Sequence, residues 1–501
     1  MIRTQESLWM NEASSTPISN QSTQITSSST MRTALYEKFQ ARISMNPVLD
    51  RTLVSFQGNK HTPFSSWFKY REGFSEALVS YLLKQLKPEP GVLLDPFSGA
   101  GSALFCASAP GWQTKGVEVL PVGIHATKAR IVASRMKARE VNAMIAQLKQ
   151  VDFATYFDQQ YALNHIAITR GAFPLEEEKQ LVGYRTYCHC QIDNGDMRVL
   201  LLYAAFCILE EMSYTRKDGQ YLRWDARSGR SQGKRPFNKG RILTFREAIF
   251  QKLEQIATSL TEETLQQELF QDDTMRPSQR PIHEIELNEG SCLEILPLQD
   301  ANSIDFVMTS PPYANRYDYT RTYALELIYL GCNEEKVKQL RQAMLSCTVE
   351  NKEKRAHLLS QYASMGQKHV FHKVESVFNN QAALQEVLAA LETYRQHGQL
   401  NNDNISRLVH NYFYEMCFVI YELSRLLKPG GIVAMVNDNV RYAGEEVPVD
   451  LILSDMAESF GLKVRHIWTL GRGKGNSSQQ MGNHGRTELR KCVYVWEKPV
   501  S

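Results

Sequence analysis

Short hydrophobic runs that end in polar or glycine-rich turns recur in two parts of the 501-residue chain. In the first part, residues 91–94 and 115–119 are predicted to be buried strands on either side of a small-residue helix. From residue 285 onward, short hydrophobic runs again alternate with polar or glycine-rich turns. This pattern predicts a strand at 304–308, a helix at 412–427 that Pro429 and two glycines end, and strands at 432–436, 462–469 and 491–496. We therefore expect an α/β fold with a mostly parallel sheet and a terminal antiparallel hairpin.

Between these two parts the short hydrophobic runs typical of buried strands are absent from the sequence, which instead has helical patterns and polar segments. We predict one α/β domain made of residues 34–140 and 285–501, interrupted by an insertion at 141–284 and carrying a second, helical insertion at 333–404. Residues 1–33 are rich in Ser, Thr, Gln and Asn and are expected to form a flexible tail.

Composition narrows the class of protein. A hydrophobic content of 43% and a charged content of 22% are typical of a folded globular protein. The nine cysteines follow no framework spacing, which favours reduced thiols, and the Cys188-His189-Cys190 cluster has no further ligands nearby, so no metal site is expected. The longest apolar stretch, 199–209, is too short for a membrane span, and we expect a cytoplasmic protein.

The first candidate site is the turn after the strand at 91–94, with the sequence Asp95-Pro96-Phe97-Ser98-Gly99-Ala100-Gly101. Its glycines let the backbone approach a ligand closely, and Glu118 ends the following strand, where an acid suits the two hydroxyls of a ribose. A dinucleotide fingerprint would have a third glycine at position 104, where this chain has Leu104. The turn thus favours a nucleotide-type ligand other than a nicotinamide.

The second candidate site is Ser310-Pro311-Pro312-Tyr313, at the end of the strand predicted at 304–308. The two prolines stiffen the loop, remove backbone donors and fix the directions of the carbonyl groups. The aromatic ring beyond them offers a stacking surface for a base drawn out of a duplex.

Together the two motifs resemble those of the DNA amino-methyltransferases, and most closely the cytosine-N4 group with its Ser-Pro-Pro-Tyr motif. The resemblance covers most of residues 60–140 and 285–497, and residues 63–70 with Phe74 and Ser75 resemble the motif that precedes the first strand in this family. It implies a Rossmann-like methyltransferase fold, S-adenosylmethionine as cofactor and double-stranded DNA as substrate. The implied cofactor-binding residues are Lys69, Tyr70, Phe74, Ser75, Asp95, Pro96, Phe97, Ser98, Gly99, Gly101, Glu118 and Ser291.

The resemblance also implies the catalytic roles. Ser310 and the Pro311 carbonyl orient the target amine, Pro312 stiffens the loop, and Tyr313 stacks on the flipped base, while the amine attacks the sulfonium methyl directly. Because the chain has no Pro-Cys pair, methylation of a ring carbon is disfavoured.

Ser at the first motif position favours cytosine N4 over adenine N6, which stays an alternative, as does a guanine-N2 RNA enzyme. Members of the family often carry an acid near residue 291 for the cofactor's adenine amine. This chain has Glu289-Gly290-Ser291-Cys292, so Ser291 or Glu289 would take that place.

Two basic segments are predicted to hold DNA. Residues 214–241 carry nine basic against two acidic residues, interleaved with aromatic ones, and residues 471–491 combine glycines with basic and amide side chains. The DNA-binding candidates are Arg216, Lys217, Arg223, Arg227, Arg230, Lys234, Arg235, Arg472, Lys474, Asn476 and Arg486.

The insertion at 141–284 is the expected recognition region, and 333–404 a clamp or dimer surface, with monomer and dimer both open. The resemblance further implies a bacterial restriction-modification or phage-defence setting, a possible partner endonuclease, and association with the nucleoid through DNA.

Overall fold

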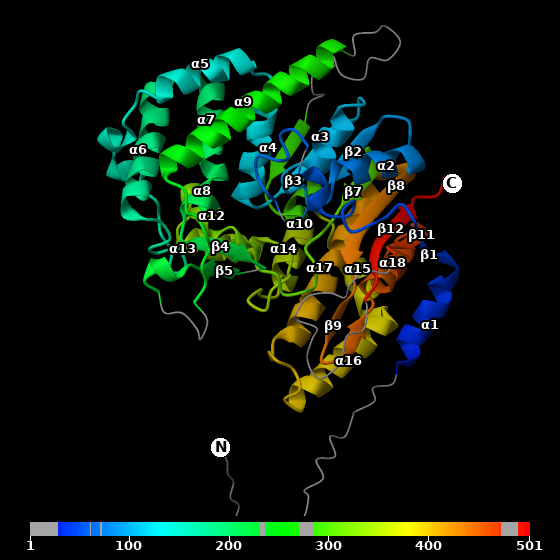
Figure 1. Ribbon diagram of the computed structural model, residues 1–501. Helices are drawn as coiled ribbons and strands as arrows, with labels where there is room; N and C mark the ends of the chain where they lie inside the picture. Colours follow the sequence, from blue (N-terminus) through cyan, green and yellow to red (C-terminus); the bar gives the residue numbers. More distant parts are fainter. Residues whose placement is uncertain are drawn as a thin grey trace, which may run out of the picture.

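The computed structural model describes residues 29–60, 62–70, 73–219, 221–230, 236–269, 285–471 and 489–500. An eight-stranded sheet forms its centre (Figure 1). In spatial order the strands are β1 (Ile43–Met45), β11 (Lys463–Thr469), β12 (Lys491–Glu497), β8 (Leu427–Asp438), β7 (Ile304–Thr309), β2 (Val92–Asp95), β3 (Gln113–Glu118) and β6 (Ile285–Glu289).

The sheet is mostly parallel. Strand β12 runs antiparallel to both neighbours, β11 and β8, while every other pair is parallel. The predicted fold class is therefore confirmed, with the terminal hairpin formed by β11 and β12. Strand β1, which pairs with the outer edge of β11, was not predicted from the sequence.

Alternate residues of the central strands face opposite sides of the sheet, as the period of a strand requires. Phe306 and Met308 pack with α2 (Glu76–Leu86) and α3 (Ser102–Ser108) on one side. Val307 packs on the other side with α17 (Ile405–Leu426) and α18 (Val449–Ser459). Because helices cover both faces of the sheet, nearly every residue of these strands is apolar. Such continuous apolar runs can be recognised in the sequence.

The first insertion forms a helical body beside the sheet, on the left in Figure 1. It lies between α4 (Pro121–Ala133) and β6, and it shares one hydrophobic core with α4 and α12 (Ala324–Tyr329). Its helices are α5 (Ala138–Leu148), α6 (Leu175–Gln191), α7 (Gly195–Cys207), α8 (Leu209–Met212) and α9 (Phe245–Leu269). A two-stranded hairpin, β4 (Thr215–Asp218) and β5 (Tyr221–Trp224), projects from the same body.

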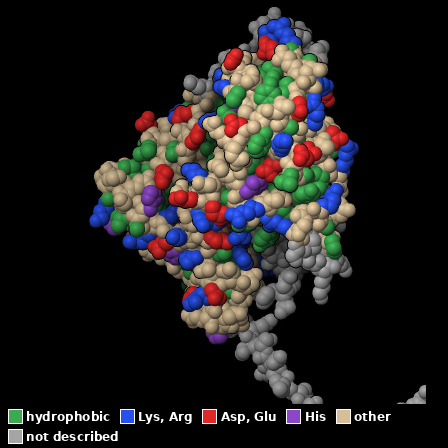
Figure 2. Space-filling view, turned by 90° about the vertical axis from the view of Figure 1, so that its left-hand side faces the viewer, with side chains coloured by type: hydrophobic (Ala, Val, Ile, Leu, Met, Phe, Trp, Pro, Cys, Tyr) green, Lys and Arg blue, Asp and Glu red, His purple; other side chains and the backbone are tan. Residues whose placement is uncertain are grey.

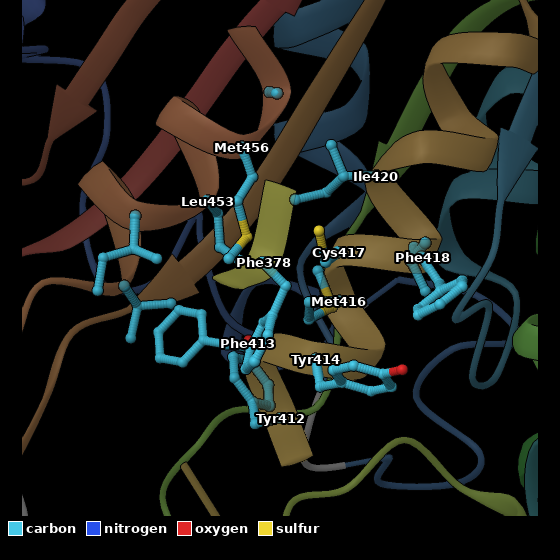
Figure 3. Packing of buried hydrophobic residues seen from close by; sticks show 14 of the residues in the cluster. Phe378, Tyr412, Phe413, Tyr414, Met416, Cys417, Phe418, Ile420, Leu453 and Met456 are labelled. Atoms are coloured by element: carbon cyan, nitrogen blue, oxygen red, sulfur yellow. The ribbon is translucent and has the colours of Figure 1, made fainter. Parts of the chain in front are cut away.

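The second insertion contains α13 (Glu334–Ala343), α14 (Arg355–Ser364), α15 (Lys368–Asn380) and α16 (Ala382–Gln396). It is joined to the domain by a continuous core, because Phe378 of α15 packs with Tyr414 of α17, which in turn packs with Phe418 (Figure 3). Met456 and Leu453 of α18 close the same cluster in Figure 3. Between α17 and α18 the chain forms the small hairpin β9 (Val440–Tyr442) and β10 (Glu445–Val447).

The predicted tail ends earlier than expected. Residues 1–28 lie outside the described residues, whereas 30–33 form the first turn of α1 (Thr30–Phe39). Arg32 forms ion pairs with Glu386 and Glu445, so α1 is tied to α16 and to β10. These partners lie more than 350 residues away in the sequence, so the composition of residues 1–33 could not indicate that this helix forms.

Among the described residues, no helix is long and apolar enough to cross a membrane. The described part of the chain also holds no group of three or more His, Cys, Asp or Glu side chains arranged for a metal ion. Of the Cys188-His189-Cys190 cluster, Cys188 is buried and Cys190 exposed. The His189 ring stacks on Tyr161 at 4.9 Å.

Candidate functional site

The glycine-rich turn between β2 and α3 has a backbone that only glycine adopts easily. Gly99 and Gly101 have positive φ angles of 52° and 81°. A Cβ atom at Gly99 would lie 2.8 Å from Cε1 of Tyr70, whose ring covers the turn. The turn and the residues before α2 are thus packed together.

Two buried carboxylates hold this turn. The Asp95 Oδ1 atom accepts hydrogen bonds from the Phe97 N–H at 3.1 Å and from the Thr309 hydroxyl at 2.7 Å, which joins the turn to the end of β7. The Glu118 carboxylate accepts the N–H groups of Gly99 and Leu120, both at 2.7 Å. Burial raises the pKa of each carboxyl to about 7.

A pocket at the carboxyl ends of β2, β3, β6 and β7 joins the two motifs. Parallel sheets bind ligands at this edge. Seven of the residues predicted from the sequence line it: Tyr70, Pro96, Phe97, Glu118, Ser291, Ser310 and Pro312. The structure adds Val117, Val119, Leu120, Gly290, Cys292, Tyr319, Ala343, Met344 and Leu345. A buried carboxylate beside apolar walls suits a ribose joined to a flat base, so the residues present fit the expected cofactor.

The other predicted cofactor residues lie outside this lining. Asp95, Ser98, Gly99 and Gly101 form the turn itself, where the Ser98 hydroxyl donates to the Val117 carbonyl at 3.2 Å. Lys69 is exposed, and Phe74 is part of the core beside α2 and α3. Ser75 is buried and caps the N-terminus of α2, accepting the Leu78 N–H at 3.1 Å. We therefore assign Ser75 a structural role.

A segment of the second insertion, residues 343–354, forms one wall of the pocket through Ala343, Met344 and Leu345. We call it the strap. The buried Glu415 carboxylate holds it by accepting the Ser346 N–H at 2.8 Å and the Lys354 ammonium at 2.7 Å. Sequence reasoning missed the strap because its pocket residues carry no motif and its anchor lies on a distant helix.

The Ser310-Pro311-Pro312-Tyr313 loop follows β7 directly. The Ser310 hydroxyl donates to the Tyr313 hydroxyl at 3.4 Å, and both side chains are half-buried, whereas Pro311 is buried. The pocket reaches Ser310 and Pro312 but leaves Tyr313 outside its lining. The motif therefore lies at the border of the pocket, with its serine on the pocket side.

The β4–β5 hairpin separates its basic residues onto two faces. Arg216 and Arg223 are exposed and directly opposite one another. Lys217 points inward, and its ammonium pairs with the buried carboxylate of Glu326 on α12. We therefore assign Lys217 to the joint between hairpin and domain, in place of the DNA contact expected from composition.

The contacts of Lys217 extend through Tyr323 to Tyr70, which lines the pocket. The Lys217 ammonium lies 4.7 Å from the centre of the Tyr323 ring, and Tyr323 stacks on Tyr70 with ring centres 5.3 Å apart and planes 11° apart. At the hairpin turn, the Tyr317 hydroxyl donates to the Gly219 carbonyl at 3.2 Å. The hairpin is thus fixed beside the segment that follows the Ser310-Pro311-Pro312-Tyr313 motif.

Two further basic candidates have partners inside the insertion. The Arg227 guanidinium pairs with the buried Asp225 at 2.7 Å, and that of Arg230 lies 3.6 Å from the centre of the Trp224 ring. Figure 2 shows the face that carries the insertion, where Lys and Arg side chains gather near the middle with Asp and Glu among them. The candidates Lys234, Arg235, Arg472, Lys474, Asn476 and Arg486 lie outside the described residues.

If Glu118 binds the ribose as expected from the sequence, its raised pKa predicts that cofactor binding depends on pH. Only the ionised carboxylate offers acceptors to both ribose hydroxyls, so we expect affinity to rise with pH through the pKa of about 7. Between pH 8 and pH 6 the dissociation constant should increase about tenfold. Calorimetric titration of the wild type and of Glu118→Gln checks this, since the variant should bind weakly with a flatter pH profile. An unchanged profile in the variant would contradict it.

Comparisons with known proteins point the same way as the geometry. No family model matches the chain. The type II methyltransferase M.AvaI of Nostoc sp. is 45% identical over 468 residues, which cover 93% of each sequence, and that of Anabaena variabilis is equally similar. The type II methyltransferase M.BsoBI of Geobacillus stearothermophilus is 39% identical over 482 residues, covering 93% of this chain and 92% of the relative. The chain therefore belongs to the type II methyltransferases, S-adenosylmethionine-dependent enzymes that methylate DNA.

Proposed function

We propose that the protein transfers a methyl group to the exocyclic N4 amine of a cytosine that is flipped out of double-stranded DNA at a specific sequence. One observation carries the proposal: the Ser310 side chain lines the cofactor pocket, while Tyr313, three residues on, lies beyond it. An amine held by Ser310 would therefore lie between the methyl donor and a base stacked on Tyr313.

In this mechanism the chain acts mainly by positioning. The cofactor supplies an electrophilic methyl group on a sulfonium. The Ser310 hydroxyl and the Pro311 carbonyl accept the two N–H bonds of the amine, which aims the nitrogen lone pair along the line of attack. As the new N–C bond forms and the S–C bond breaks, positive charge moves to the amine, and the oxygens that accept its hydrogen bonds stabilise that charge until a proton leaves to solvent.

The outer face of the β4–β5 hairpin is the proposed phosphate contact. Arg216 lies opposite Arg223, and like charges in directly opposite positions destabilise a hairpin unless an anion lies between them. The side chain of Arg223 is 51% exposed, and its guanidinium lies 3.5 Å from the exposed Asp218 carboxylate and 4.2 Å from the centre of the Phe237 ring. We propose that phosphates beside the target base contact Arg216 and replace Asp218 as the partner of Arg223.

Arg216→Gln and Arg223→Gln should each weaken duplex binding and reduce the slope of log affinity against log salt by about 1. Fluorescence anisotropy at several salt concentrations measures both effects. Arg465→Gln, which removes a partly exposed guanidinium on β11, is the matched control and should leave the slope unchanged. Unchanged slopes in both hairpin variants would remove the hairpin from the DNA surface.

The function itself is tested by incubating the protein with labelled S-adenosylmethionine and unmethylated genomic DNA, followed by digestion and mass spectrometry of the nucleosides. N4-methylcytosine is the expected product. N6-methyladenine would keep the mechanism but change the target base, and label found only in RNA as N2-methylguanine would replace the substrate.

We further propose that the methylation protects host DNA from a partner restriction endonuclease, which places the protein in the bacterial cytoplasm with the nucleoid. Mapping the methylated sequence and challenging modified and unmodified DNA with candidate nucleases from the same host tests this. Equal cleavage of both DNAs by each candidate would argue against the partnership.

A further inference from the structure

A second polar pair stands beside the catalytic motif, on the side away from the cofactor pocket. Asp438 ends β8, Lys491 begins β12, and the two residues are direct partners across the antiparallel strands. The Lys491 ammonium lies 3.6 Å from Asp438 Oδ1 and 5.9 Å from the centre of the Tyr313 ring. The side chains are 27% and 20% exposed, so both groups are largely but not completely withdrawn from water.

In the Asp438–Lys491 pair, one carboxylate oxygen has no hydrogen bond within the described residues. Asp438 Oδ1 is buried and has no hydrogen-bond partner within the described part of the chain, since the ammonium stands just beyond hydrogen-bond distance. Withdrawing a carboxylate and an ammonium from water is costly unless their remaining donors and acceptors are used. An ammonium that lies 3.6 Å from a carboxylate oxygen and 5.9 Å from the centre of a stacking ring suits a ligand that presents acceptors next to an aromatic ring.

A flipped cytosine is such a ligand. Its exocyclic amine is a donor, and the adjoining ring edge presents two acceptors, N3 and O2. Adenine presents the same amine and one acceptor, N1, followed by a C–H group. We propose that Lys491 determines base specificity by donating to the acceptor edge of the target cytosine, with Asp438 orienting the ammonium. This inference rests on the proposed function and extends it to the rest of the base.

A comparable pair at the other end of β12 provides the control. Arg465 of β11 lies 3.7 Å from Glu497 of β12, with side chains that are 38% and 30% exposed. It joins adjacent strands at a similar distance but lies at the edge of the sheet away from both motifs. Removing it reports what a cross-strand ion pair contributes to the fold alone.

The test compares wild type, Lys491→Met, Lys491→Arg and Arg465→Met on duplexes of the mapped recognition sequence with cytosine or adenine at the target position. For Lys491→Met we expect kcat on cytosine to fall about 10- to 100-fold, the loss of a hydrogen bond from a charged donor. The cytosine-to-adenine rate ratio should fall by the same factor, with the dissociation constant of S-adenosylmethionine unchanged. Lys491→Arg should recover part of the ratio, and Arg465→Met should match wild type.

Three other outcomes would each contradict either this inference or the proposed function. Wild-type turnover of cytosine by Lys491→Met would overturn this inference and leave the proposed function standing. An equal loss on cytosine and adenine would make the pair structural and would also overturn it. A wild-type product other than N4-methylcytosine would overturn the proposed function, and this inference with it.

Discussion

Replacing Tyr313 by alanine should lower kcat at least about 100-fold while leaving the affinity for S-adenosylmethionine unchanged. The ring is half-buried beside Ser310 and lies outside the lining of the cofactor pocket. Stacking of a base on an aromatic side chain contributes about 1–3 kcal/mol, and without it the flipped base loses the surface that aligns its amine. Single-turnover methylation assays measure the rate, and calorimetry measures cofactor binding.

Tyr313→Phe is the matched control. It keeps the ring and removes only the hydroxyl that accepts from Ser310 at 3.4 Å, a long contact that contributes little. The phenylalanine variant should retain most of the rate. If Tyr313→Ala turned over normally, the stacking role and the catalytic assignment of the motif would both be lost.

Breaking the Lys217–Glu326 pair should destabilise the protein by about 3–5 kcal/mol, because either single replacement leaves an unpaired charge in the interior. The two side chains are only 4% and 2% exposed, and Glu326 Oε2 already has no hydrogen bond within the described residues. Lys217→Met should therefore lower the unfolding midpoint in guanidinium chloride. It should also weaken cofactor binding, since Tyr323 supports the Tyr70 wall of the pocket.

The double variant Lys217→Met/Glu326→Leu separates charge from packing. Two apolar side chains of similar volume should restore most of the stability that the single variants lose. A Lys217→Met protein as stable as wild type, or a double variant less stable than either single one, would contradict the view that the pair is a buried joint.

The strands and the two motifs could be predicted because each has a local cause. The strands predicted at 91–94 and 304–308 correspond to β2 and β7, where consecutive apolar residues serve two covered faces. The predicted helix at 412–427 begins earlier, at Ile405, and ends at Leu426. There the chain enters β8 directly, and Pro429 lies within the strand, at a register shift in its pairing with β7.

What the sequence could not show depends on distant partners. Lys217 resembles its basic neighbours in composition, and only the alternation of buried and exposed residues in β4 marks it as inward-facing. Its partner Glu326 lies 109 residues further along the chain. The strap was invisible for the same reason, because its pocket residues are ordinary apolar ones and Glu415 lies on another helix.

Family membership confirms the predicted cofactor and the coarse activity. The choice of cytosine N4 stays a prediction. It rests on Ser310 and, through the inference above, on a residue 181 positions later that no local motif marks.

The place of the first insertion has a consequence for how this helical body could be replaced during evolution. The chain enters the insertion after α4 and re-enters the sheet at β6, which is the direct neighbour of β3. A helical crossover between adjacent parallel strands needs little chain, so the whole body from α5 to α9 could be exchanged as one cassette without altering strand order. Its shared core with α4 and α12 sets the condition: a transplanted cassette must bring apolar side chains that match those helices, and an inward lysine for Glu326.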